Sequence, residues 1–316
     1  QGLLKLTYMK KFFINTLSAA ALLATIYGCG KDSFDKPDYY SRKAETVFGQ
    51  QVVDGSADYI AHVKTSTERN LMDGVQLLEL GILDRSSHAV QAYIYKVELG
   101  AALVKVSTPD NAVKVEKTQK LTKQATAIEN TGKYLVMGGI CGGAFNSETG
   151  TPDGILYHSS KVIGASFGKN ENAFFAIKKD GAAVCLPSDE FESHKAKSVE
   201  AVSGSAMILQ EGYVLTETDA KTIAKAAVGV DAEGSTVYLI VVDGGDYFYS
   251  NGISNSDMAN LMKGCGASNA MILNQGNNVS AFVRDEDSIE LFKVIDKPSN
   301  MGLEAAIGNG LVILQL

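Results

Sequence analysis

The sequence predicts an α+β fold: a single domain with a large mixed or antiparallel sheet and about two principal helices. Short apolar segments, rich in β-branched and aromatic residues and separated by glycine-containing turns, recur from residue 75 to the end of the chain. Only two segments carry a helical pattern of apolar residues. No internal repeat or low-complexity linker follows Ser41, so nothing in the sequence divides this part into two domains.

The hairpin at residues 225–245 is the clearest sheet element. Residues 226–230 and 237–242 form two apolar runs around the turn Asp231-Ala-Glu-Gly234. Nearly every residue of both arms is apolar, which predicts burial on both faces. We expect further strands at 75–80, 91–99, 134–137, 154–156, 173–177, 182–186, 206–209, 270–273, 279–283, 289–294 and 311–316.

The two predicted helices cover residues 117–130 and 254–263. In the first, Leu121, Ala125 and Ile128 repeat at helical spacing and form one apolar stripe. In the second, a serine precedes an apolar face that includes Met258 and Leu261, so it can cap the helix.

Residues 1–29 have the pattern of a signal peptide. A basic start at Met9-Lys-Lys11 precedes an apolar run, and Ile26-Tyr-Gly-Cys29 resembles a bacterial lipobox. Lipidation of Cys29 would tether the chain to a membrane outside the cytoplasm, in the cell envelope; the alternative is an N-terminal anchor helix. We expect residues 1–8 to precede the true start, 30–70 to form a tether and N-terminal segment, and 71–316 to form the domain.

Composition excludes several classes of function. The net charge of -7 indicates no basic nucleic-acid surface. The four histidines, at positions 62, 88, 158 and 194, have no metal-ligand spacing, and we expect neither a metal nor an organic cofactor. After Cys29, Cys141, Cys185 and Cys265 permit at most one disulfide, and we interpret them first as small buried residues.

Two glycine-rich segments are candidate site edges. Residues 138–146, GGICGGAFN, let the backbone approach a ligand or another strand closely, but they match neither a dinucleotide motif nor a P-loop. Asp243-Gly-Gly245 follows a buried strand and places a carboxylate beside open backbone, although the spacing alone favours a turn that requires glycine. Ser203-Gly-Ser205 suits hydrogen bonding to a sugar or phosphate oxygen better than nucleophilic attack.

The order of these segments resembles the phosphodiester glycosidase family, over about residues 75–316. The matching segments, in order, are GGICGGAFN at 138, TPDGI at 151, VSG at 202, KAAVGVDAEG and VVDGG, the helix at 254–263, residues 269–276, and KPSN with AIGNGLV near the end. The resemblance implies a glycan or sugar phosphodiester as the partner, and a site that grips the phosphate and brings a nucleophile or water to the anomeric carbon. It assigns substrate binding to Cys141, Gly142, Gly143, Asn146, Ser203, Gly204, Gly244 and Gly276.

Three departures from the family pattern fall on implied site positions. Cys141 stands where members usually have Asn, Lys225 where they have Arg, and Asn274 where they have Asp. Lys225 keeps a positive charge for the phosphate but not the planar fork of Arg, and without the resemblance it reads as a surface lysine at a strand start. Asn274 lacks the carboxylate needed for a base or nucleophile. The candidate catalytic residues are Asp243, Lys225 and Asn274.

Two functional hypotheses follow. The first is a membrane-tethered glycosidase that hydrolyses a sugar 1-phosphodiester or related glycan. Asp243, Glu148 or Asp153 could supply the carboxylate that Asn274 lacks, although the pattern around each favours a turn residue. The second is a degenerate member that binds a glycan or glycan phosphate without cleaving it. The sequence predicts neither the sugar nor the oligomeric state.

Overall fold

The computed structural model describes residues 40–215 and 221–315. Residues 41–316 form one compact unit. Cys29 and the signal-like segment lie outside the described residues. Within the described residues, no helix has both the length and the apolar character needed to span a membrane.

An eight-stranded sheet forms the centre of the unit, with every neighbouring pair antiparallel. The predicted hairpin is in its middle, where Lys225 pairs with Val242 and Val230 with Val237. In spatial order the strands are β1 Ile60–Met72, β2 Val75–Asp84, β3 Ala89–Glu98, β15 Thr236–Val242, β14 Lys225–Val230, β16 Asn269–Gln275, β12 Ala206–Gln210 and β13 Tyr213–Val214.

Two five-stranded sheets and one short pair of strands complete the β-structure of the described residues. One five-stranded sheet has the order β18 Phe292–Val294, β17 Ala281–Arg284, β6 Leu135–Cys141, β20 Gly310–Gln315, β4 Leu103–Ser107. The other has the order β10 Ala183–Pro187, β9 Ala173–Lys178, β11 Ser198–Gly204, β7 Leu156–His158, β8 Lys161–Gly164. The short pair is β5 Gln119–Lys120 with β19 Ala306–Ile307.

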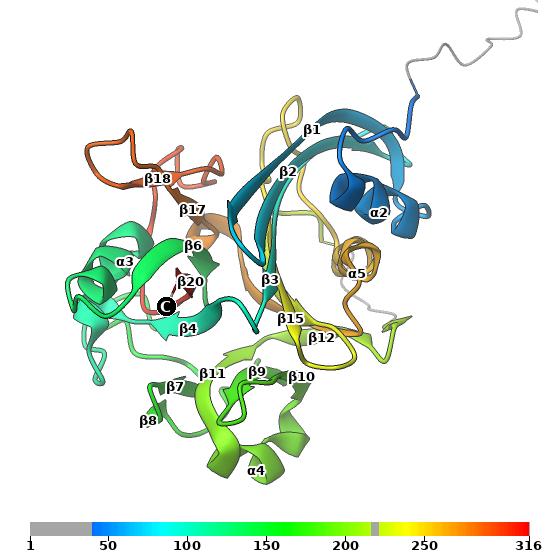
Figure 1. Ribbon diagram of the computed structural model, residues 1–316. Coiled ribbons are helices and arrows are strands. Elements are labelled where there is room, and N and C mark those ends of the chain that lie inside the picture. The colour runs from blue at the N-terminus through cyan, green and yellow to red at the C-terminus, as the bar shows by residue number, and fades with distance from the viewer. Residues whose placement is uncertain (1–39, 216–220, 316) are drawn as a thin grey trace, which may run out of the picture. The chain divides into compact units, whose positions relative to one another are not determined.

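Helices α2 (Val47–Gly55) and α5 (Asn255–Cys265) lie on one side of the eight-stranded sheet (Figure 1). Their buried side chains share an apolar cluster with that face of the sheet, including Val52, Met258 and Ile240. Thr46 and Ser254 cap their N-termini by accepting backbone N–H groups, and Gly266 ends α5 with φ 108°. Helix α3 (Leu121–Glu129) packs on the sheet of β6, and the short α4 (Phe191–His194) on the sheet of β9.

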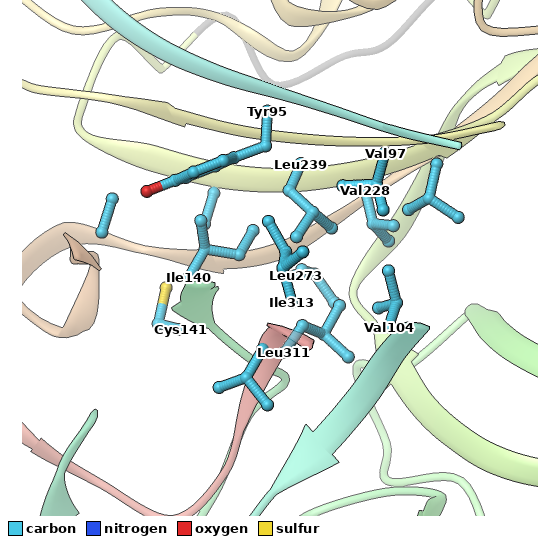
Figure 2. Packing of buried hydrophobic residues seen from close by; sticks show 14 of the residues in the cluster. Tyr95, Val97, Val104, Ile140, Cys141, Val228, Leu239, Leu273, Leu311 and Ile313 are labelled. Atoms are coloured by element: carbon cyan, nitrogen blue, oxygen red, sulfur yellow. The ribbon is translucent and has the colours of Figure 1, made fainter. Parts of the chain in front are cut away.

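The opposite face of the eight-stranded sheet contributes to the main core. Figure 2 shows Leu239, Val228 and Leu273 of the eight-stranded sheet facing residues of the five-stranded sheet that contains β6. These residues are Ile140, Leu311 and Ile313. Tyr95 is fully buried there, and its hydroxyl donates a hydrogen bond to the Phe282 carbonyl at 2.6 Å. Since removing a large side chain from such a core costs about 2–5 kcal/mol, this packing fixes the relative positions of the strand ends around it.

The predicted α+β class is confirmed, with three differences in detail. The strands are divided among several sheets. A third principal helix, α2, forms in a region that the sequence pattern left unassigned. The compact unit already begins at Ser41, and the expected boundary between residues 70 and 71 falls inside β1. This stretch was hard to assign because β1 is long, bulged and largely polar, and depends on pairing with β2.

Candidate functional site

The glycines at 138–143 serve close contact within the protein. A Cβ on Gly139 would lie 2.5 Å from the Leu311 carbonyl oxygen, and one on Gly143 would lie 2.4 Å from that of Ser203. Gly142 is equally restricted, since a Cβ there would lie 2.0 Å from Asn309 Oδ1. Of the two expectations for this segment, a close approach to a ligand or to another strand, the structure shows close approach to other parts of the protein.

Two asparagines hold the end of this segment. The Gly143 N–H donates to Asn309 Oδ1 at 2.8 Å, and the Gly142 N–H donates to the Asn309 carbonyl at 3.0 Å. Asn274 Nδ2 lies 3.4 Å from both the Gly142 and the Gly143 carbonyl oxygens. Both N–H groups are thus already engaged. Asn274 is half-buried and acts as a donor here, a role that a carboxylate cannot fill.

Cys141 is fully buried at the end of β6. Burial raises the pKa of its thiol to about 12, and its backbone N–H donates to the Ser280 carbonyl. Cys185 and Cys265 are also buried and free, and burial raises the pKa of both thiols. All three fit the expectation of small buried residues, and Cys141 presents no thiolate to a substrate.

Asn146, Glu148 and Asp153 are exposed. Asn146 Oδ1 accepts the N–H groups of Glu148 and Thr149, which closes a local turn. Asn146 begins this turn, Glu148 lies within it and Asp153 lies in a bend, and their contacts in the described chain do not bring the three together as a binding site.

Ser203 and Gly204 are buried at the end of β11. Ser203 pairs across the strands with Phe174, whose ring belongs to the apolar cluster that includes Phe191 of α4. The Ser203 hydroxyl hydrogen-bonds to the Glu171 side chain. Burial raises the pKa of Glu171, and its Oε2 atom is buried without a hydrogen-bond partner among the described residues. No motif indicated this carboxylate from the sequence. Gly204 lies against the Ile272 carbonyl, where a Cβ would approach to 2.4 Å.

Lys225 is 1% exposed, which excludes the surface lysine that its position had suggested. Its ammonium donates to the Lys221 carbonyl at 3.1 Å and to the Asn255 side chain of α5. The neighbours Ala224 and Ala226 face the main core, so Lys225 projects to the helix-covered face. The structure therefore places Lys225 on the face opposite Asn274.

Asp243 lies at the floor of a pocket directly after β15. The pocket has a volume of about 220 Å³ and is lined by Asp243, Gly244, Gly245, Asp246, Tyr249, Lys297, Pro298, Ser299, Met301 and Gly302. The Asp243 carboxylate is 2% exposed and accepts the Lys297 N–H at 3.1 and 3.2 Å. Burial raises its pKa to about 7, against hydrogen bonds from Lys297, Tyr249 and Tyr93 that favour the ionised form.

Two further charged groups near Asp243 were not singled out as site residues by the sequence motifs. Lys297 lines the pocket, whereas Asp296 is a buried neighbour that does not line it. Asp296 Oδ1 accepts from Ser280 Oγ at 3.2 Å and the Ala281 N–H at 2.8 Å, while Oδ2 is buried without a partner in the described chain. Burial, together with the nearby charge of Asp243, raises the Asp296 pKa to about 8. The Lys297 ammonium pairs with Asp246 at 2.7 Å and lies 5.1 Å from the centre of the Tyr249 ring.

Gly244, beside Asp243, and Gly276, close to Asn274, both contact the backbone of Ala224, which directly precedes β14. A Cβ on Gly244 would lie 2.2 Å from the Ala224 nitrogen, and the Gly276 N–H donates to the Ala224 carbonyl at 2.9 Å. Asp243 and Asn274 thus lie at the same end of the sheet, on the face of the main core, with β14 between their strands. Adjacent strands are about 4.8 Å apart, so this arrangement separates the two residues by roughly 10 Å.

Within the described residues, no group of three or more His, Cys, Asp or Glu side chains is arranged to hold a metal ion. The ionisable groups near these strand ends include the Asp243 and Asp296 carboxylates, the hydroxyls of Tyr93 and Tyr249, and the Lys297 ammonium.

Comparison with known proteins agrees with this architecture. The zebrafish N-acetylglucosamine-1-phosphodiester alpha-N-acetylglucosaminidase catalytic domain, auto-inhibited by its pro-peptide, is 21% identical, with TM-score 0.58 over 78% of this chain and 83% of that one. A hypothetical protein from Synechocystis is 10% identical, with TM-score 0.56 over 79% and 64% of the two chains. An exported protein from Burkholderia pseudomallei is 11% identical, with TM-score 0.54 over 72% and 74%.

These structural likenesses show a shared fold. No curated protein sequence matched the chain. The sequence profile of the phosphodiester glycosidases matches residues 134–314, more than half of the chain, and spans β6, the central hairpin, α5 and β20. By this match, the chain belongs to the phosphodiester glycosidase family.

Proposed function

We propose that the protein hydrolyses a sugar 1-phosphodiester or a related glycan at the Asp243 pocket. One observation carries the proposal: a buried carboxylate, with its pKa raised to about 7, shares a pocket with the half-exposed ammonium of Lys297. A carboxylate with a pKa near neutrality can exchange a proton with a reacting group at neutral pH. An ammonium at the mouth can attract a phosphate oxygen.

In this reaction a water oxygen bonds to the anomeric carbon, and the bond from that carbon to the phosphate-ester oxygen breaks. Asp243 accepts the proton of the water, and the phosphate monoester leaves as an anion that needs little protonation. Lys297 takes the phosphate-binding role that the sequence had assigned to Lys225, which is engaged with Asn255 on the other face. Asp246 already pairs with Lys297 and must share it with the phosphate.

A second candidate function is binding of a glycan or glycan phosphate without cleavage. It is favoured by Asn274, whose amide donates toward Gly142 and Gly143 and supplies no base. The burial of Lys225 favours it as well, because this ammonium is 1% exposed and donates to groups inside the protein.

Turnover of an N-acetylglucosamine 1-phosphodiester distinguishes the two. We would compare the purified wild-type chain with Asp243→Asn, Asn274→Asp and the control Asp189→Asn, an exposed acid outside the pocket. Turnover by wild type and the control, lost in Asp243→Asn, supports hydrolysis at this pocket. Turnover unchanged in Asp243→Asn contradicts the assignment of the site. Turnover only in Asn274→Asp supports the non-cleaving alternative.

The membrane tether is a separate part of the proposal and rests on the sequence around Cys29. Lipidation there would hold the chain to the cell envelope on the extracytoplasmic side. Incorporation of labelled palmitate by the wild-type chain, and none by Cys29→Ser, is the expected result. Equal labelling of both would exclude Cys29 as the lipidation site.

A further inference from the structure

A second cavity, of about 300 Å³, lies next to Tyr134, which directly precedes β6. Two lysines line it, and none of its lining residues is acidic, although the chain as a whole has a net charge of -7. Tyr134 and Cys141 are at opposite ends of β6, and seven residues of strand span roughly 23 Å. The cavity is thus far from the Gly142 segment and from the Asp243 pocket, and the proposed function does not use it.

Both lysines lie near the Tyr134 ring. Lys133 Nζ lies 4.8 Å and Lys105 Nζ 5.8 Å from the ring centre. Attraction between an ammonium and an aromatic face is worth about 0.5–1 kcal/mol at exposed sites. Two positive charges thus line one cavity before any ligand arrives, and an anion bound there would reduce their repulsion, although Glu200 offsets part of the Lys105 charge.

Two further contacts hold the Lys105 ammonium in place. Its ammonium donates to Ser159 Oγ and lies 3.3 Å from Glu200 Oε1. Glu200 is buried and accepts the backbone N–H groups of Ser159 and Val106 at 3.0 and 3.2 Å. Lys105 is therefore a positioned cation whose remaining donors can face the cavity. Lys133, by contrast, is exposed and can adjust to a ligand.

The cavity wall contains an acceptor that lacks a donor. Asn111 Oδ1 is buried and has no hydrogen-bond partner in the described part of the chain. Asn111 and Ser159 also have positive φ angles, 55° and 52°, in a region that residues with side chains rarely adopt. A hydroxyl group of a bound molecule would supply the missing donor to Asn111.

From these contacts we propose that the cavity binds an anionic monosaccharide, with its phosphate or carboxylate group between Lys105 and Lys133 and a hydroxyl group donating to Asn111. The volume is at the lower end of the range for small-molecule sites and suits a single sugar ring. A sugar satisfies both halves of the site, because it carries hydroxyl donors beside the anionic group.

Calorimetric titration of the full-length chain tests this proposal, with glucose 6-phosphate and glucuronate as the two anionic probes and glucose and inorganic phosphate as controls. We expect one or both anionic sugars to bind at least tenfold more tightly than either control, because the site uses the charge and the hydroxyls together. Preference for one probe identifies the anionic group. Failure of both probes to bind, or equal binding of glucose, overturns the proposal.

Variants place the binding in this cavity. Lys133→Met should weaken binding about tenfold, whereas Lys123→Met, the same charge change at an exposed site of α3, should leave it unchanged. Binding should persist in Asp243→Asn, which separates this site from the proposed catalytic pocket. Equal loss in both lysine variants would reveal non-specific attraction, and loss only in Asp243→Asn would place the ligand in the other pocket; either result overturns the proposal.

Discussion

Lys225 and Asn274 lie on opposite faces of the same sheet, although β14 and β16, which carry them, are hydrogen-bonded neighbours. The Lys225 ammonium binds Asn255 at the start of α5, and the Asn274 amide donates toward Gly142 and Gly143 on the side of the main core. One substrate cannot touch both side chains at once. The two substitutions relative to the family motif therefore have separate consequences.

For Lys225, the consequence concerns stability. Lys225→Ala should lower the free energy of unfolding by about 2–4 kcal/mol, because it removes a buried side chain and leaves Asn255 and the Lys221 carbonyl without their donor. Urea denaturation measures the change. The control is Lys263→Ala, an exposed position of α5, which should change stability by less than about 0.5 kcal/mol. Similar, small effects of both substitutions would show that Lys225 is not held as described.

The close approach at Gly143 gives a second prediction. An added methyl group would meet the Ser203 carbonyl at 2.4 Å, so Gly143→Ala should destabilise the fold by about 1–3 kcal/mol. Gly100→Ala is the matched control, because a Cβ there meets nothing within 4 Å. Thermal unfolding of both variants measures the difference. An unchanged melting temperature for Gly143→Ala would mean that the two segments can separate freely.

The cysteines should be unreactive in the folded protein. Cys141, Cys185 and Cys265 are buried, and burial raises the pKa of each thiol, so almost no thiolate is available at neutral pH. A Cys29→Ser chain treated with a thiol-reactive dye should incorporate none of it until denaturant is added, and then three equivalents. Rapid labelling without denaturant would show that at least one of these sites opens.

Much of the fold could be predicted because the pattern is local. The hairpin of β14 and β15 has two apolar arms around a glycine turn, and α5 begins at a serine cap, so neighbouring residues determine both elements. Strand β1 could not be predicted in this way. Its largely polar sequence becomes a strand through long-range pairing with β2, which no local window records.

The site shows the same limit more strongly. Sequence motifs indicated Asp243 and Asn274, and the structure places both at one end of the sheet. They did not indicate on which face Lys225 projects, since this depends on where α5 packs. Nor did they indicate Asp296 or Glu171, whose burial and unpartnered oxygens arise only when distant strands come together.

The acids beneath the pocket predict how stability depends on pH. The pKa is raised from an ordinary 3.8 to about 7 for Asp243 and to about 8 for Asp296, so between about pH 4 and pH 8 the folded state binds more protons than the unfolded state. Stability should therefore be greatest at the acidic end of this window and fall as the pH rises through the two folded-state pKa values. Urea denaturation at a series of pH values measures the slope.

Asp243→Asn and Asp296→Asn should each flatten that slope, because an amide does not titrate. Asn at position 243 can still accept the Lys297 N–H, so the variant should fold and, above about pH 8, be at least as stable as wild type. Hydrolysis, by contrast, should rise in wild type as the pH increases through about 7, since Asp243 must be ionised to accept a proton from water. Stability and turnover thus depend on pH in opposite directions. A stability that rose between about pH 5 and pH 8 would show that these carboxylates are stabilised as anions, contrary to their buried environment.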